Sequence, residues 1–227
     1  MELGGWKELE RPALSGIIIG PGSIKRMSVY MAIMQRILGA LGSYGIDFGE
    51  CVIRDWRMDD AASIARYANN RKIWNNLRDA FPHPYSKNDA LAYISRSMQA
   101  DPRVAFAIAT EREAIGSIGL APGKDVHRFT AELGYWLAEP FWERGIMTEA
   151  VKAVSEYALE TLGFCRVYAE PYAVNPASAR VLEKSGFVLE GVMRASVFKD
   201  GRVLDQFLYA KVKSEIRLRN HFADRMV

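Results

Sequence analysis

The residues with the clearest chemical potential lie in the run ELGYWLAEPFWERGIMTEA, which begins at Glu132. The pattern predicts a strand that ends near Leu137, a loop that carries Arg144 and Gly145, and a helix from about Thr148. The first amides of a helix have no partner within it, and with the helix dipole they favour a phosphate group. The glycine allows close approach, and the arginine adds charge. An anion-binding loop is therefore predicted, although such turns also occur without a ligand.

A second helix start follows the next predicted strand, 166–170. The sequence NPASARVLEKSGF begins at Asn175, a favoured N-cap residue, and a proline follows at the first helical position. Together with strand 130–137 and the helix between them, strand 166–170 predicts a right-handed βαβ crossover. Ligands of open α/β sheets bind beyond the carboxyl ends of the strands, so Asn175 and Ser178 are expected to face a ligand there. Simple helix capping explains the same two residues.

Other elements must position these two helix starts. Periodicity and turn signals predict a mixed α/β fold in which antiparallel strands predominate. The expected elements are strand 51–56, helix 59–69, a short helix within 74–81, helix 87–99 with a Ser86/Asp89 capping box, strands 104–108 and 114–120, helix 148–162, helix 175–186, and a closing hairpin of 188–198 and 203–212.

Composition narrows the class of protein. The chain has 227 residues, 49% hydrophobic and 25% charged, which is typical of a folded globular protein. Its 30 basic and 27 acidic residues give a net charge of +3, which offers no argument for DNA binding. Two cysteines permit no disulfide framework and fit a reducing, cytoplasmic setting. The apolar run 30–46 is interrupted by Gln35 and Arg36, so no membrane span or export signal is expected.

Three segments are expected along the chain. Residues 1–47 are glycine-rich with weak periodicity, including a short strand at 17–19 and a helix at 27–41, and are interpreted as an extension of unknown role. Residues 48–213 form the domain, and 214–227 form a mildly basic tail. No metal site is expected, because the three histidines are isolated from one another.

The two helix starts, in this order and at this distance, resemble the GCN5-related N-acetyltransferases (GNAT). The matching motifs are RGIMTEA and N-x-x-S-x-x-x-L-E-K-x-G-F, and the resemblance covers roughly Cys51 to Val212. It is strongest to the RimJ/RimL group, which acetylates protein N-terminal amines, particularly those of ribosomal proteins. The resemblance implies a mostly antiparallel central sheet with one parallel crossover and helices on both faces. It also implies a ternary complex with acetyl-CoA as co-substrate.

The resemblance also implies roles for individual residues. The cofactor is expected beside Leu137, with its pantetheine arm beside Asn175. Its pyrophosphate is expected on the loop before the long helix. That loop departs from the general family pattern at Trp142 and Met147. Many family members protonate the departing thiolate with a tyrosine where this chain has Leu182. Ser178 is the expected substitute, or the thiolate leaves unaided. The predicted pyrophosphate loop comprises Glu143, Arg144, Gly145, Ile146, Met147 and Thr148.

Direct attack by an amine requires a neutral amine and a polarised carbonyl. Glu132 is the candidate base, and a structural carboxylate is its alternative interpretation. Backbone amides near Gly134 and Tyr135 are candidates for polarising the carbonyl. The expected acceptor contacts are aromatic, although such side chains are more often part of a core: Trp74, Phe81, His83, Tyr85 and Tyr135.

Three functions remain open from the sequence. The first is acetylation of a protein α-amine, the second acetylation of a small amine such as a polyamine or aminoglycoside. The third is a non-catalytic acyl-CoA-binding module, which the leucine at position 182 keeps open. The basic tail offers slender support for ribosome association, and the sequence leaves a homodimer open.

Overall fold

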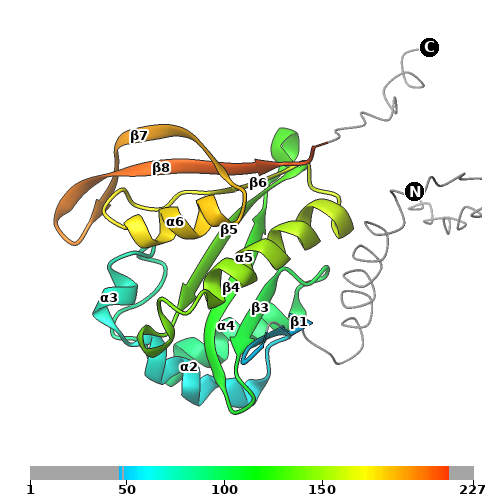
Figure 1. The fold of residues 1–227 in the computed structure, drawn as a ribbon. Coiled ribbons are helices and arrows are strands. Elements are labelled where there is room, and N and C mark those ends of the chain that lie inside the picture. Colours follow the sequence, from blue (N-terminus) through cyan, green and yellow to red (C-terminus); the bar gives the residue numbers. More distant parts are fainter. Residues whose placement is uncertain (1–45, 48, 215–227) are drawn as a thin grey trace, which may run out of the picture.

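A single eight-stranded sheet forms the centre of the computed structural model, which describes residues 46–47 and 49–214 (Figure 1). The strand order is β1-β2-β3-β4-β5-β6-β8-β7, and only β5 and β6 are parallel neighbours. The mixed, mostly antiparallel sheet with one crossover is therefore confirmed. The strands are β1 (Ile46–Asp47), β2 (Val52–Arg54), β3 (Ala105–Ala109), β4 (Ala114–Pro122), β5 (Thr130–Leu137), β6 (Arg166–Ala169), β7 (Val188–Lys199) and β8 (Arg202–Val212).

The predicted short strand at 17–19 and helix at 27–41 lie outside the described residues, as does nearly all of the predicted tail. The last part of the predicted extension does join the sheet, because Ile46 and Asp47 pair with Ile53 and Val52.

The helices follow the local sequence signals closely. The Ser86/Asp89 capping box opens α4, and Asn175 caps α6, as predicted. The short helix lies earlier than expected, and the long helix begins at Ile146 and ends in a π-helical turn. None of the described helices combines the length and apolarity needed to cross a membrane. The helices are α2 (Ala61–Ala68), α3 (Arg71–Trp74), α4 (Lys87–Gln99), α5 (Ile146–Glu156) and α6 (Pro176–Lys184), with shorter turns η1 (Met58–Asp60), η2 (Asp125–His127), η3 (Glu139–Phe141) and η4 (Tyr157–Thr161).

Helices cover both faces of the sheet (Figure 1). The larger core cluster joins the sheet to α5 and α6, and includes Val151 and Leu182. The second cluster joins the other face to α2 and α4, through Ile64 and Ile94. Because side chains alternate along a strand, neighbouring residues in β3 belong to different clusters. The predicted helix layers on both faces are confirmed.

The feature that positions the site is a fork between β5 and β6. These strands pair only through Thr130, Ala131 and Glu132, opposite residues 166–168. Beyond Glu132, β5 continues beside β4 as far as Leu137. The chain after β6 turns toward β8, and Tyr172 pairs there with Gln206 of β8. One edge of β5 is therefore left without a strand partner.

The β7–β8 hairpin reaches beyond the sheet and docks on the segment around α3 (Figure 1). Lys199 Nζ lies 2.7 Å from Asp79 Oδ1 and 3.4 Å from the centroid of the Trp74 ring. At the hairpin turn, Asp200 Oδ1 accepts a hydrogen bond from Arg71 at 2.7 Å. The aliphatic stem and ammonium group of Lys199 are almost fully buried, at 2% exposure, so these contacts fix the hairpin against α3.

Candidate active site

The predicted anion loop has the geometry of a backbone cradle. Glu143 and Gly145 both have positive φ, at 61° and 77°, and Gly145 is the N-cap of α5. No side chain caps this helix, and no hydrogen bond is recorded for the amides of 143–148 within the described part of the chain. Left-handed residues next to a helix start direct successive N–H groups toward one point. The loop is thus suited to an anion.

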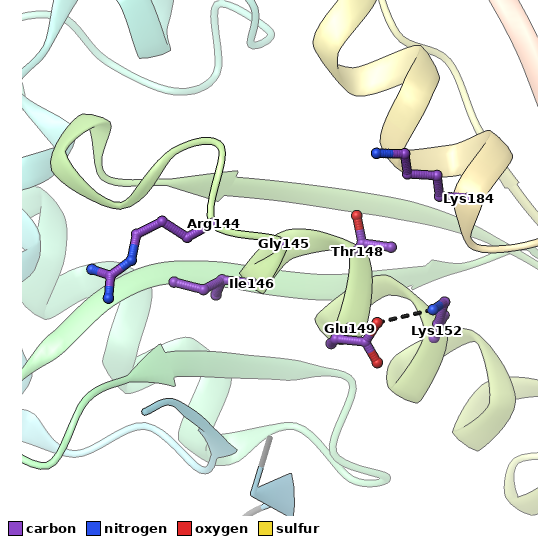
Figure 2. A pocket seen from close by; sticks show the side chains of 7 residues that line it. All are labelled: Arg144, Gly145, Ile146, Thr148, Glu149, Lys152 and Lys184. Carbon is purple, nitrogen blue, oxygen red and sulfur yellow. Dashed lines mark hydrogen bonds and ion pairs between the residues drawn. The ribbon is translucent and has the colours of Figure 1, made fainter. Parts of the chain in front are cut away.

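Basic side chains surround this helix start. The loop borders a hollow of about 560 Å³. Its lining includes Arg144, Lys152 and Lys184 (Figure 2). Arg144 forms an ion pair with Glu50, and Lys152 lies 2.9 Å from Glu149. No ion pair involving Lys184 occurs among the described residues. The sequence analysis missed both lysines, although the position of Lys152 two turns into the helix was a signal for it.

At the fork, β5 beyond Glu132 has no strand beside it on the β6 side within the described part of the chain. The Leu120 amide donates a hydrogen bond to the carbonyl of Val104, next to β3. The backbone groups of the neighbouring Gly119 therefore face β5, where Gly119 pairs with Gly134. Because backbone groups alternate sides along an antiparallel strand, Leu133 and Tyr135 point away from β4, and Tyr135 lies beyond the residues of β5 that pair with β6. The carbonyl of Leu137, which also faces the fork, accepts a 2.7 Å hydrogen bond from the indole of Trp142.

The start of α6 shows the predicted helix cap. Asn175 Oδ1 accepts a 3.2 Å hydrogen bond from the Ser178 amide, so the capping interpretation is correct. Among residues 46–47 and 49–214 its side-chain amide nitrogen has no hydrogen-bond partner, so it can donate to a ligand. Ser178 Oγ lies 2.8 Å from Tyr135 Oη, a contact that the sequence analysis missed. Tyr135 was predicted to contact the acceptor, but its hydroxyl lies on the α6 side of the sheet.

Two carboxylates face each other across the fork, on the opposite side of the sheet from α6. Arg78 Nη2 lies 2.6 Å from Glu132 Oε1 and 3.5 Å from Glu170 Oε2. Burial and the neighbouring Glu132 charge raise the pKa of Glu170, while Arg78 opposes that rise. Sequence analysis identified Glu132 but neither Glu170 nor Arg78, because they come from different segments of the chain.

The predicted acceptor aromatics occupy two groups. Phe81 lies between Tyr85 and Trp136, at 4.8 and 6.0 Å between ring centroids. Tyr85 is 6% exposed and belongs to the core, where burial raises its pKa to about 12. Trp74 contacts Lys199 on its ring and lies 5.6 Å from His83, so it also anchors the hairpin. Through Trp136, Phe81 thus contacts the face of β5 that carries Glu132.

Comparisons with known proteins agree with this arrangement. Residues 51–188 match the family model described as an acetyltransferase (GNAT) domain. The chain is 36% identical over 102 residues to the uncharacterized N-acetyltransferase YoaA of Bacillus subtilis (strain 168), across 45% of this chain and 57% of that relative. It is 32% identical over 107 residues to the ribosomal-protein-serine acetyltransferase of Escherichia coli (strain K12), across 47% of this chain and 59% of that relative. Each match thus spans less than two thirds of the relative.

A solved structure shares the fold. It is the spermidine N-acetyltransferase from Vibrio cholerae in complex with CoA and spermine, with a TM-score of 0.62 and 22% sequence identity. The similarity covers 73% of this chain and 96% of that one, and at this identity it shows the fold alone.

The raised pKa of Glu170 predicts a pH-dependent effect on stability. Above its ordinary pKa of 4.5, the unfolded chain releases this proton more readily than the folded protein does, so stability falls as pH rises toward the folded pKa. Glu170→Gln removes this pH-dependent loss of stability. We expect its free energy of unfolding to match the wild type near about pH 4 and to exceed it near about pH 7, by less than about 1.4 kcal/mol.

Urea unfolding at the two pH values measures this difference. Glu190→Gln is the matched control, because Arg166 lowers the pKa of Glu190 and its removal shifts stability in the opposite direction. A Glu170→Gln protein that is less stable than wild type at neutral pH would show that Arg78 outweighs burial and repulsion.

Proposed function

The chain belongs to the GNAT acetyltransferase family, and on that premise we propose that it transfers the acetyl group of acetyl-CoA to a primary amine. The preferred acceptor in this proposal is the N-terminal α-amine of a protein. One observation carries it: the β5–β6 fork joins an anion-binding loop on one side of the sheet to a pair of carboxylates on the other.

The cofactor would run along the fork. Its pyrophosphate would accept hydrogen bonds from the amides of the loop that holds Gly145, near Lys152 and Lys184. Its pantetheine amides would pair with the free edge of β5 and with the side-chain amide of Asn175. The thioester would then lie at the start of α6, where the fork amides of β5 can polarise its carbonyl.

The acceptor would approach from the face that carries Glu132. An α-amine has a pKa near 8, so about a tenth of it is neutral at pH 7, whereas a lysine amine is neutral only about once in 2,500. A carboxylate and a water molecule suffice to deprotonate an α-amine. We propose Glu132 as this base, with Glu170 beside it. The similarity to the ribosomal-protein-serine acetyltransferase of Escherichia coli supports a ribosomal-protein acceptor.

A small cationic amine is the second candidate acceptor. Glu132 and Glu170 together form a site that attracts a cation, and Arg78 already occupies it in part. The Vibrio cholerae structural neighbour is described with spermine, which is consistent with such a site in this fold. A non-catalytic acyl-CoA-binding module is the third candidate, and it differs in predicting no turnover.

An acceptor panel tests the proposed function. Release of CoA from acetyl-CoA would be measured with peptides that carry free N-termini, with N-terminally blocked lysine peptides, and with polyamines and aminoglycosides. We expect turnover with free N-termini, and at least about tenfold less with blocked lysine peptides, because their amine is rarely neutral. Faster turnover of polyamines would support the small-amine function, and binding of acetyl-CoA with no turnover on any amine would contradict catalysis.

The anion loop predicts a specific loss of cofactor binding. Gly145→Glu places a carboxylate where the pyrophosphate would bind, so we expect the affinity for acetyl-CoA to fall more than about 100-fold. Gly163→Glu is the matched control, because both glycines have φ near 77° and neither has an atom within 4 Å of an added Cβ. Isothermal titration calorimetry measures both variants. Equal affinities would exclude this loop as the pyrophosphate site.

The base assignment predicts a pH-dependent loss of rate. Glu132→Gln should lower kcat/KM by about 100-fold near pH 7, and the loss should shrink at higher pH because the amine then loses its proton unaided. If Glu132 only holds Arg78 in place, the loss would be the same at every pH. Steady-state kinetics from neutral to alkaline pH separate the two, with Glu190→Gln as an unaffected control.

A further inference from the structure

At the start of α6 the hydroxyl groups of Tyr135 and Ser178 are in contact, although the two residues lie far apart in the sequence. Tyr135 Oη is 2.8 Å from Ser178 Oγ and 3.4 Å from the Ser178 carbonyl oxygen. We propose that Tyr135 is a positioning residue, which orients the Ser178 hydroxyl so that it donates a hydrogen bond to the sulfur of the departing CoA. The inference rests on the proposed function and adds a residue to it.

Either hydroxyl can donate in the contact between Tyr135 Oη and Ser178 Oγ, and we assign Tyr135 as the donor. A backbone carbonyl can only accept, so the Tyr135 proton has two acceptors, both of them on Ser178. The backbone amide of Ser178 is bonded to Asn175 Oδ1. Ser178 is thus held through its amide, its carbonyl and its hydroxyl oxygen. With Tyr135 as the donor, the Ser178 hydroxyl proton is left to bond to a ligand.

The tyrosine keeps its proton throughout. Burial raises the pKa of Tyr135 well above its ordinary range, and the bond to Ser178 only partly opposes this. The phenol is therefore a neutral donor at any pH where the enzyme works. That property suits a residue that orients a neighbour and does not suit one that gives up a proton.

The packing around Leu182 explains why the tyrosine hydroxyl is supplied by β5 and not by α6. Its side chain is fully buried within the core cluster between α6 and the sheet. A tyrosine at that position would need extra volume in a packed core. Tyr135 reaches the same helix from β5, because odd-numbered residues of this strand face α5 and α6, as the core residues Leu133 and Leu137 do.

The chemical step balances without a proton from Ser178. The amine nitrogen forms a bond to the acetyl carbon, the carbon–sulfur bond breaks, and its electron pair stays on sulfur. The amine proton passes to Glu132 or water. A thiol with a pKa near 8.5 is a far stronger acid than an alcohol, so Ser178 keeps its proton and stabilises the thiolate by a charge-assisted hydrogen bond. The thiolate takes its proton from water after release.

The test is the pKa of the thiol of bound CoA, measured from the ultraviolet absorbance of the thiolate in the binary complex. It needs no acceptor and no turnover. We expect this pKa to lie below that of free CoA, and to rise by about one unit in Ser178→Ala and in Tyr135→Phe. The double variant should equal Ser178→Ala alone, because Tyr135 acts through Ser178.

The control is Tyr209→Phe, which removes a buried hydroxyl that bonds to Glu183 of the same helix, at 2.8 Å. It should leave the thiol pKa unchanged. An unchanged pKa in Tyr135→Phe, or effects of the two substitutions that add, would overturn the positioning role. Single-turnover acetyl transfer should fall about tenfold in both single variants. A wild-type protein that binds no CoA would refute the proposed function itself, whereas CoA binding with an unshifted thiol pKa would refute only this inference.

Discussion

The separation of β5 from β6 is the constraint on which the rest of the site depends. The side chain of Gln206 on β8 donates a hydrogen bond to the carbonyl of Glu170, and the backbone of Gln206 pairs with Tyr172. The chain after β6 therefore follows β8. β5 remains paired with β4. Backbone groups left between the two strands have no strand partner, and buried backbone groups in native proteins are nearly always bonded. A ligand that carries amides along its length, as pantetheine does, satisfies them.

The pleat of β5 then separates two chemical tasks. Successive side chains point to opposite faces, so Glu132 faces Arg78 and the acceptor aromatics, whereas Tyr135 faces Ser178 and α6. One strand therefore supplies a carboxylate to the proposed amine and, through Tyr135, orients the Ser178 hydroxyl toward the proposed leaving group. The backbone between them would face the acetyl group. A one-residue shift of register would exchange these faces and remove both functions at once.

Features that depend on neighbouring residues were predictable, and those that depend on long-range contacts were not. The bounds of β5 and the caps at Ser86 and Asn175 follow from local patterns. The site contacts instead join residues 43, 54 and 92 positions apart, namely Tyr135–Ser178, Arg78–Glu132 and Arg78–Glu170. The alternation of strand 130–137 already placed Glu132 and Tyr135 on opposite faces. The acceptor contact expected of Tyr135 stays a prediction, and its contact with Ser178 could not be read from the sequence.

Two energetically unfavourable features of the protein favour binding of the proposed ligands. Glu143 adopts a left-handed conformation that costs a non-glycine residue about 1 kcal/mol, and it turns the loop amides toward an anion. Glu132 and Glu170 repel each other across the fork, which helps to raise the pKa of Glu170. An arriving ammonium relieves that repulsion, as Arg78 does in part. The raised pKa also makes Glu170 a better proton acceptor than an ordinary carboxylate, so the proposed base Glu132 has beside it a second group that could take up the amine proton.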